Sequence, residues 1–301
     1  MNTHLTHSLI LSQEDIQYII LHYEPDRLMD LVIDKLTNTF KNYDASEMEI
    51  PARSGFHYTK PVTGLIEWMP LYANKKSVTI KIVGYHPGNP KQQNIPTIIS
   101  TISSYDATTG HLLGVMDGVL PTAIRTGAAS AVASKHMASP ISTVLGLIGC
   151  GAQSVTQLHA LSRIFPIKKV LIHDIDSVAE RSFKNRCRSL HLDIEIIPSS
   201  TQDILIQSDI VCTATSIEAG AGPLFGDFET NPALHINAIG SDFPGKIELP
   251  LNFLKKSFIC PDFIEQAVIE GECQQLSIDE IGPDIVTLLQ NSEKYSFVYK
   301  Q

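Results

Sequence analysis

The first part of the chain shows two hydrophobic patterns in succession, the first helical and the second strand-like. Apolar residues recur at helical spacing over residues 13–22 and 25–42, and the first of these helices begins at Ser12, with an acid three residues later. Strand-like segments follow at 63–70, 78–85, 97–105 and 112–117. Short turns join these strands, which predicts a largely antiparallel sheet and an α+β domain over residues 1–122, with residues 45–60 as loop or edge strand.

A different pattern begins after a helix of small residues predicted over 121–137. Short apolar runs then alternate with helical segments. The predicted strands are 143–148, 169–173, 193–197, 209–213 and 233–238, and the predicted helices are 152–164, 177–190 and 201–207. This alternation is typical of a doubly wound parallel sheet. The predicted fold class is therefore α/β, with a Rossmann-type dinucleotide-binding domain over residues 123–301 and the α+β domain before it.

A glycine-rich turn joins the first strand and helix of the second domain. The apolar run Val144–Ile148 leads into Gly149-Cys150-Gly151, and a helix is predicted from Ala152. In such a unit, glycines permit the tight turn and let the backbone approach a pyrophosphate, which the helix N-terminus binds. Ser154 stands where the G-x-G-x-x-G fingerprint has its third glycine, so the turn alone also fits a loop that binds no phosphate.

The next predicted strand strengthens the dinucleotide interpretation. It spans Lys169–His173 and is followed by Asp174, at the distance from Gly149 that one strand–helix–strand unit requires. An acid at this position binds the adenosine ribose hydroxyls and repels a 2′-phosphate, which favours NAD over NADP. Asp176 is a nearby alternative for the same role. Strand, turn, helix, strand and acid together predict dinucleotide binding.

Composition excludes several classes of protein. The chain has 301 residues and a net charge of −9, which argues against binding to nucleic acid or to anionic membranes. Its five cysteines are scattered and never spaced as C-x-x-C, which is typical of reduced thiols and predicts a cytoplasmic protein. No apolar run is long enough to cross a bilayer, and no secretory signal is evident. Because metal-ligand spacings, G-x-S-x-G and Walker A sequences are absent, neither a metal site nor P-loop chemistry is expected.

Charged residues in unusual surroundings are the candidates for chemistry. Arg125 lies among small residues, where it either reaches solvent or forms an anion-binding fork, and Arg53 lies in a predicted loop. Glu67 and Lys81 interrupt apolar strands, where they either pair with each other or lie on the wet face of a strand. Asp242 follows the strand ending near residue 239, so it is either a site residue at the sheet edge or a loop aspartate making turn hydrogen bonds.

Six stretches, in the same order along the chain, resemble one known family. They are GLIEWMP (64–70), KIVGYHPGN (81–89), AIRTGAA (123–129), GCGAQS (149–154), NAIGSDFPGKIEL (237–249) and EGECQQL (270–276). Together they span about residues 10–285 and resemble the ornithine cyclodeaminase/mu-crystallin family. The last stretch favours the bacterial ornithine cyclodeaminases over the alanine dehydrogenases and ketimine reductases of that family.

The resemblance implies a role for each candidate residue. Arg53, Lys81 and Arg125 would clamp the α-carboxylate of an amino acid. Glu67 would orient the amino acid, and Asp242 would move protons and hold the side-chain amine, so that Asp242, Glu67 and Lys81 form the implied catalytic set. The residues implied to hold NAD are Thr126, Gly149, Gly151, Ala152, Gln153, Ser154, Asp174, Thr215, Ala238 and Gly240.

The implied reaction is the deaminating cyclisation of L-ornithine to L-proline and ammonia. A hydride leaves Cα and returns to the same carbon within one turnover, so NAD is not consumed. The family also implies a small-molecule amino-acid substrate and a homodimer formed through the sheet of the first domain, which would then serve for substrate binding and dimerisation. An amino-acid dehydrogenase, a ketimine reductase and a catalytically silent ligand-binding protein are the alternatives. Ornithine and lysine differ by one methylene, which the sequence does not resolve.

The end of the chain departs from the family pattern. Family members usually continue for several dozen residues past the position of Leu289, with a turn near the cofactor and a helix that returns to the first domain. Residues 291–301 contain no such turn, so this return is expected to be shortened. Residues 295–300 are the segment expected to form the strand before it.

Overall fold

A computed structural model describes residues 7–295, and the chain divides into two compact units. Unit 1 comprises Met1–Glu24 and Tyr43–Thr122, and unit 2 comprises Pro25–Asn42 and Ala123–Gln301. The segment expected to form a strand over 295–300 lies outside the described residues except for Tyr295. No helix among residues 7–295 is long and apolar enough to cross a membrane.

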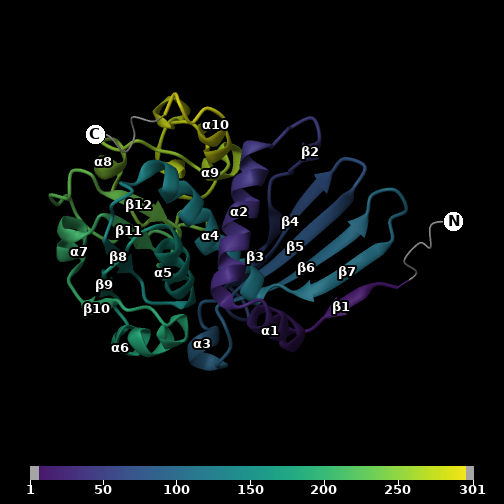
Figure 1. The fold of residues 1–301 in the computed structure, drawn as a ribbon, viewed down its shortest axis with the longest axis horizontal. Helices are drawn as coiled ribbons and strands as arrows, with labels where there is room; N and C mark the ends of the chain where they lie inside the picture. Colours follow the sequence, from purple (N-terminus) through teal and green to yellow (C-terminus); the bar gives the residue numbers. More distant parts are fainter. Residues whose placement is uncertain (1–6, 296–301) are drawn as a thin grey trace. The chain divides into compact units, whose positions relative to one another are not determined.

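Unit 1 is built on a mostly antiparallel sheet. In its described part the strand order is β1-β7-β6-β5-β4-β2, and β3 also pairs with β4 (Figure 1). The strands are β1 (Leu9–Leu11), β2 (Met48–Glu49), β3 (Ser54–Tyr58), β4 (Gly64–Ala73), β5 (Ser77–Tyr85), β6 (Ile98–Asp106) and β7 (Leu112–Asp117). The four strands predicted from the sequence are confirmed, and β2 and β3 occupy the segment predicted as loop or edge strand. The parallel pairing of β1 with β7 was not predicted.

The described part of unit 1 also contains the helices α1 (Gln13–His22) and the short α3 (Asn89–Gln92). The side chain of Ser12 accepts a hydrogen bond from the backbone N–H of Asp15, and the Asp15 carboxylate accepts one from the N–H of Ser12. This reciprocal cap satisfies two backbone N–H groups that the first turn leaves without partners, which is why α1 begins where the sequence predicted.

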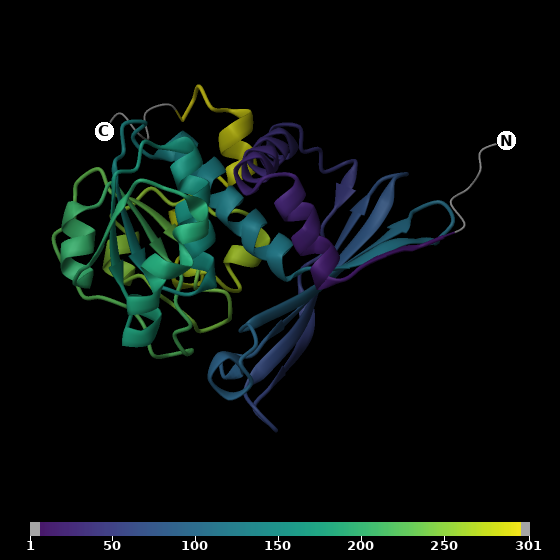
Figure 2. The same cartoon turned by 60° about the horizontal axis from the view of Figure 1, so that its bottom comes forward.

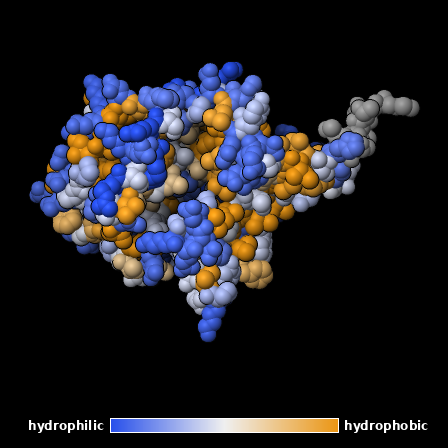
Figure 3. Space-filling view, turned by 90° about the horizontal axis from the view of Figure 1, so that it is seen from below, coloured by the Kyte–Doolittle hydropathy of each residue, from blue (hydrophilic) through white to orange (hydrophobic). Residues whose placement is uncertain are grey.

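The two faces of the unit 1 sheet differ in exposure. Leu65 and Glu67 of β4 are buried, whereas Ile66, between them, is 41 % exposed because successive side chains of a strand point to opposite faces. Ile82 on β5 and Ile99 on β6 share the face of Ile66 and are each 40 % exposed. Figure 3 shows apolar side chains gathered on a surface of this unit. Unit 1 therefore presents an apolar sheet face with no covering layer from its own described residues.

Unit 2 contains a five-stranded parallel sheet, counted over the described residues, in the order β10-β9-β8-β11-β12. The strands are β8 (Val144–Ile148), β9 (Lys169–His173), β10 (Glu195–Pro198), β11 (Ile210–Thr213) and β12 (His235–Ala238). The helices are α2 (Pro25–Lys41), α4 (Val119–Met137, which begins in unit 1), α5 (Ala152–Ile164), α6 (Ser177–Arg186), α7 (Thr201–Gln207), α8 (Leu251–Leu254), α9 (Ile264–Ala267) and α10 (Ile285–Gln290). In chain order the strands lie 3-2-1-4-5, as in the Rossmann fold, which confirms the predicted fold class.

The core of unit 2 lies between this sheet and its helices. Leu145 and Leu147 of β8 are fully buried and pack with Leu158 of α5 and Phe183 of α6. These positions come from the apolar stripes that predicted the strand and the helices, so the sheet forms because both of its faces are buried.

Helix α2 belongs to unit 2, whereas the sequence placed residues 25–42 in the first domain. Arg163 of α5 forms a two-pronged ion pair with Asp30 of α2, at 2.8 and 2.7 Å, and a third contact of 2.8 Å with Asp26. Met29 and Ile33 of α2 are buried in one cluster with residues of α4 and α10, and Figure 2 shows α2 in purple beside α10 in yellow. These contacts join residues more than a hundred positions apart, which local sequence patterns do not reveal.

Polar side chains of β12 meet the hydroxyl of Ser134 on α4. His235 Nε2 lies 3.0 Å from Ser134 Oγ of α4, and the amide of Asn237 donates to the same hydroxyl at 2.9 Å. Burial lowers the pKa of His235 to about 4. His235 is therefore neutral in the folded protein at pH values where an unfolded histidine is already protonated.

This difference predicts an acid-dependent loss of stability. The unfolded state binds a proton at His235 below about pH 6.5 while the folded state does not until about pH 4, so the free energy of unfolding falls as the pH decreases through this window. We expect the free energy of unfolding of His235→Gln to depend less on pH in this window. The total change between pH 6.5 and pH 4 should be smaller than in the wild type by up to about 3 kcal/mol, measured by urea unfolding at several pH values. His22→Gln, at an exposed position of α1, is the matched control. An unchanged slope in His235→Gln contradicts this assignment.

Candidate active site

The glycine-rich turn closes the carboxyl end of β8. Gly149 has φ of 95°, and a Cβ atom on it would lie 2.5 Å from the carbonyl oxygen of Ala214. Only glycine meets both conditions. Gly151 is the N-cap of α5, no side chain caps this end by a hydrogen bond, and open space surrounds the position that its Cβ would occupy. The backbone N–H groups at the start of α5 therefore border a space that an anion can enter.

Ser154 is part of the turn itself. Its side chain is fully buried, and its hydroxyl donates a hydrogen bond of 2.5 Å to the carbonyl oxygen of Gly149. The serine at the third position of the fingerprint thus holds the turn from inside. Its neighbours in the first turn of α5 are Ala152, which is exposed, and Gln153, which is half-buried.

Asp174 lies at the carboxyl end of β9, next to the turn. Its carboxylate accepts hydrogen bonds from the backbone N–H of Cys150 at 2.6 Å and of Asp176 at 2.8 Å. Asp176 is the N-cap of α6 and accepts from the N–H of Val178 at 2.9 Å. Because Asp176 serves as a helix cap, Asp174 is the better candidate for binding a ribose.

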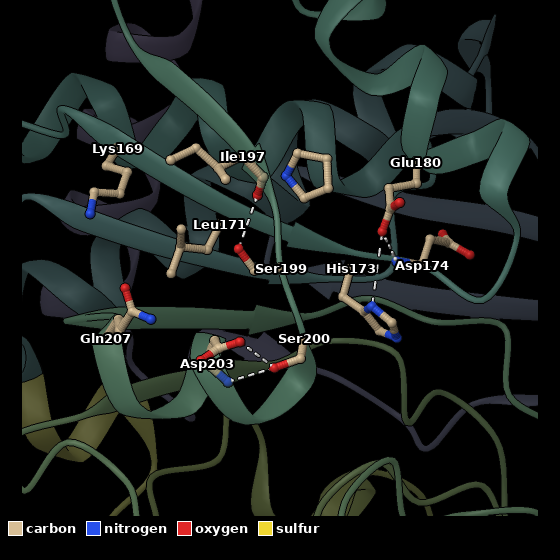
Figure 4. Close-up of a pocket in the computed structure, with 11 residues that line it drawn as sticks. Lys169, Leu171, His173, Asp174, Glu180, Ile197, Ser199, Ser200, Asp203 and Gln207 are labelled. Atoms are coloured by element: carbon tan, nitrogen blue, oxygen red, sulfur yellow. Dashed lines mark hydrogen bonds and ion pairs between the residues drawn. The ribbon is translucent and has the colours of Figure 1, made fainter.

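An open groove runs along β9 and β10 from this point. Figure 4 shows Asp174, His173 and Glu180 at one end of it and Ser200 and Asp203 of the α7 start at its side. Ser200 caps α7 by accepting from the N–H of Asp203 at 3.0 Å. The polar groups that line the groove are thus mostly engaged in helix caps and local hydrogen bonds.

Arg186, which the sequence analysis missed, also contacts the turn. Its guanidinium donates to the carbonyl oxygens of Cys150 and of Gly151, the latter at 3.3 Å, and to that of Ala179 at 3.1 Å. These contacts satisfy two carbonyl groups of the turn with a cation. The only signal in the sequence is a basic residue in the last turn of the second Rossmann helix, a common place for one.

Asp242 lies on the loop that follows β12. Its carboxylate forms an ion pair of 2.7 Å with Lys246, whose side chain is 3 % exposed, whereas that of Asp242 is 37 % exposed. The pair brings one acid and one buried cation to the carboxyl edge of the sheet. Lys246 was not among the predicted site residues, although its place four residues after the acid in the tight segment D-F-P-G-K is a usable signal.

A second acid, Glu248, lies beneath this loop and is fully buried. Its carboxylate accepts from the hydroxyl and the backbone N–H of Thr215 at 2.6 and 2.8 Å, from the Thr213 hydroxyl at 2.6 Å and from the Gly240 N–H at 2.9 Å. Burial raises the pKa of Glu248. Thr215, Ala238 and Gly240, all implied cofactor residues, thus cluster where β11 and β12 end.

Two of the candidates in unit 1, Glu67 and Lys81, lie on the same face of its sheet. Glu67 is 7 % exposed, and Gly55 on β3 leaves room for it, since a Cβ there would lie 2.7 Å from Glu67 Cγ. Lys81 lies opposite Met69, two residues along β4 from Glu67, so the two charged residues share a face. Arg53 directly precedes β3. Glu67 and Lys81 therefore lie on neighbouring strands with their side chains on one face of the sheet.

His57 is a further residue that the sequence analysis did not select. Its Nε2 atom lies 3.0 Å from Oε1 of Glu67, across the β3–β4 pair. Glu67 therefore has a histidine partner within its own hairpin, beside the pairing with Lys81 considered from the sequence.

Arg125 and Thr126 lie on α4. The helix packs closely on α5, because a Cβ at Gly127 would lie 2.5 Å from the carbonyl oxygen of Thr156. Ala128 and Ala131 are fully buried, whereas Arg125 is exposed. The small residues around Arg125 thus serve helix packing, and the exposed position of Arg125 is compatible with either of the two roles considered from the sequence. Among the described residues, no cluster of acids, histidines and cysteines has the arrangement of a metal site.

Comparison with known proteins identifies the family. The model of the ornithine cyclodeaminase/mu-crystallin family matches residues 17–292. The chain belongs to this family. It is 41 % identical over 280 residues to L-lysine cyclodeaminase of Streptomyces rapamycinicus, covering 93 % of this chain and 81 % of that protein. It is 32 % identical over 259 residues to ornithine cyclodeaminase of Agrobacterium tumefaciens, covering 83 % and 71 %.

Solved structures of the family have the same fold. A lysine cyclodeaminase, whose structure was described as the basis for recognition of L-lysine, L-ornithine and L-2,4-diaminobutyric acid, superposes with a TM-score of 0.94 at 41 % identity, over 97 % of this chain and 85 % of that one. An archaeal alanine dehydrogenase, a dimer with bound NAD, gives a TM-score of 0.80 at 29 % identity, over 94 % and 85 %. The resemblance stated from the sequence is confirmed at the level of the family.

The geometry of the turn generates a test of the ribose role. We expect Asp174→Ala to weaken NAD binding about tenfold or more, because the mutant loses the acceptor for the ribose hydroxyls and the contact with the N–H of Cys150. Calorimetric titration with NAD and with NADP measures both affinities.

Asp176→Ala is the matched control, since it removes a neighbouring aspartate that caps α6. It should lower the melting temperature while leaving the preference for NAD over NADP unchanged. If the control alone weakens NAD binding, the ribose role moves from Asp174 to Asp176.

Proposed function

We propose that this protein is an NAD-dependent cyclodeaminase that converts an α,ω-diamino acid into a cyclic amino acid and ammonia. L-Ornithine, which would give L-proline, is the substrate implied by the resemblance. L-Lysine, which would give the six-membered homologue, is the second candidate, because the 41 % identical relative is a lysine cyclodeaminase. The pairing of Asp242 with the buried Lys246 at the carboxyl edge of the unit 2 sheet is the observation that carries the proposal.

NAD is the cofactor, and the turn fits it. The tight Gly149 turn, the open space at Gly151 and the uncapped start of α5 suit a pyrophosphate, and Asp174 suits the adenosine ribose. When bound, NAD supplies reversible hydride transfer at Cα of the substrate. Thr126, Thr215, Ala238 and Gly240 are proposed to complete its site.

The remaining chemistry belongs to the protein's own side chains. Arg53, Lys81 and Arg125 are proposed to bind the α-carboxylate, and Glu67, which His57 contacts, to bind the α-amine. Asp242 accepts a proton from the terminal ammonium group, so that this amine can attack C2, and returns a proton to the departing ammonia. One C–N bond forms and one breaks, and the hydride taken from Cα comes back to it, so substrate equals product plus ammonia.

The direct test is incubation of the purified protein with L-ornithine or L-lysine and a catalytic amount of NAD. We expect the cyclic amino acid and ammonia in equal amounts with no net reduction of NAD. Asp242→Asn should lower kcat at least about a hundredfold while NAD binding persists, because the variant lacks the proton-transfer group and the charge that pairs with Lys246. Asp227→Asn, an exposed aspartate elsewhere in unit 2, is the control and should keep full activity.

Other outcomes decide against the proposal. Stoichiometric reduction of NAD with an amino acid such as L-alanine, without cyclisation of either diamino acid, identifies a dehydrogenase. Binding of NAD without turnover of any of these substrates identifies a ligand-binding protein. Normal cyclisation by a folded Asp242→Asn variant removes the role of Asp242.

A homodimer through the unit 1 sheet is also part of the proposal. The exposed apolar face formed by Ile66, Ile82 and Ile99 supports it, since such a face is costly in water. We expect a dimer by light scattering and a shift toward monomer in Ile82→Lys. Ile278→Lys, an exposed isoleucine of unit 2, is the control and should leave the mass unchanged. A monomeric wild-type protein, or a dimeric Ile82→Lys variant, contradicts this interface.

A further inference from the structure

Two buried carboxylates lie one behind the other under the loop that carries Asp242. The first, Glu248, accepts four hydrogen bonds from three residues and so uses both of its oxygens fully. Of the three donor residues, Thr213 ends β11, Thr215 follows β11, and Gly240 follows β12. One side chain therefore ties the carboxyl ends of two neighbouring strands, at the point where the loop begins.

The second carboxylate, Glu272, binds the backbone of the first. It accepts from the N–H of Glu248 at 2.8 Å and of Leu249 at 3.2 Å, and from the Gln275 amide at 2.8 Å. Glu272 is 9 % exposed. Because Glu248 can reach Gly240 and Thr215 only if its own backbone is in place, the two acids act in series.

A neighbouring amide holds the middle of the loop. Gln274 donates to the carbonyl oxygen of Lys246 at 3.0 Å and accepts from the N–H of Gly245 at 2.6 Å. Lys246 in turn holds Asp242 at 2.7 Å. The segment 272–275, a single 3-10 turn, thus fixes residues 245–249 by four backbone hydrogen bonds given above, and these residues fix Asp242.

Stability alone gives no reason for two buried acids at this place. A carboxylate removed from water is costly even when it accepts several hydrogen bonds, and two such groups repel each other. Burial and the charge of Glu248 raise the pKa of Glu272 to about 7. What the arrangement provides is a fixed backbone geometry, which a reacting group requires and an apolar core does not supply.

We propose that Glu248 and Glu272 are positioning residues that hold Asp242 and Thr215 in fixed relation at the carboxyl edge of the unit 2 sheet. The proposal rests on the cyclodeaminase activity inferred above. It assigns a function to the stretch EGECQQL, in which Glu272 and Gln274 are loop anchors and neither contacts the substrate.

The test compares Glu248→Gln and Glu272→Gln with Asp209→Asn in the full-length protein. A glutamine places an N–H₂ group against backbone N–H donors, so each variant loses part of its clamp at nearly constant volume. Asp209 is the matched control because its carboxylate accepts from the N–H groups of Thr143 and Val144, at 2.8 and 3.0 Å, at the opposite, amino edge of the same sheet. All three variants lose a contact between a buried or half-buried carboxylate and backbone N–H groups. Only in Glu248→Gln and Glu272→Gln does this contact belong to the loop that carries Asp242.

We expect kcat to fall about 10- to 100-fold in Glu248→Gln and Glu272→Gln, with KM for the diamino acid changing less than about threefold, because the carboxylate-binding cations are elsewhere. Glu248→Gln should also weaken NAD binding, since Thr215 loses its partner. Asp209→Asn should lower the melting temperature and leave kcat unchanged. If Glu248→Gln or Glu272→Gln does not fold, Gln274→Ala gives the same test without a change of charge, and we expect a smaller fall in kcat of the same kind.

Hydrogen exchange supplies a readout that does not depend on turnover. Peptides covering residues 240–249 should exchange faster in the two glutamate variants than in the wild type, and at the wild-type rate in Asp209→Asn. If the glutamate variants show faster loop exchange but the wild-type protein cyclises neither diamino acid, Glu248 and Glu272 still anchor the loop and the proposed activity is wrong. Unchanged loop exchange, or a fall in kcat in Asp209→Asn that matches its loss of stability, overturns the positioning role.

Discussion

The buried carboxylate of Glu248 joins the carboxyl ends of β11 and β12, and the geometry of this edge of the unit 2 sheet depends on that contact. Parallel strands end with backbone N–H and C=O groups that no further strand can pair. At this edge Glu248 satisfies the N–H groups of Thr215 and Gly240 together with two threonine hydroxyls. The loop that carries Asp242 therefore starts from a fixed point rather than from a frayed strand end.

The glycine-rich turn at the carboxyl end of β8 also has its backbone groups divided between internal and external partners. Its N–H groups at the start of α5 remain directed at open space, while its carbonyl groups are occupied by Ser154 and Arg186. This division leaves donors for an anionic ligand and removes acceptors that would repel it. Asp174, the residue proposed to bind the ribose, accepts a hydrogen bond from the N–H of Cys150 and is thereby held next to that turn.

The unit 1 sheet carries Glu67 and Lys81 on one face and exposed apolar residues on the other. The strict alternation of β4 and β5 separates the two roles, since Glu67 and Lys81 point to one side and Ile66 and Ile82 to the other. Substrate binding and dimer formation are thus proposed for opposite faces of the same strands.

Local patterns were sufficient to predict most elements, because strand and helix periods depend on which side chains face a core. They predicted the Rossmann alternation from residue 143, the Gly149 turn and an acid at position 174 after the second strand. The six sequence stretches shared with the family were sufficient to identify it. Tertiary structure decided the rest, because the contacts concerned join distant segments. Arg163 attaches α2 to unit 2 through Asp26 and Asp30. Glu272 reaches back 24 positions to the backbone of Glu248. The hydrophobic pattern around Glu248 and Glu272 does not distinguish them from exposed glutamates. Their burial against specific backbone N–H donors, which only the tertiary structure shows, is what gives each of them its proposed role in the loop.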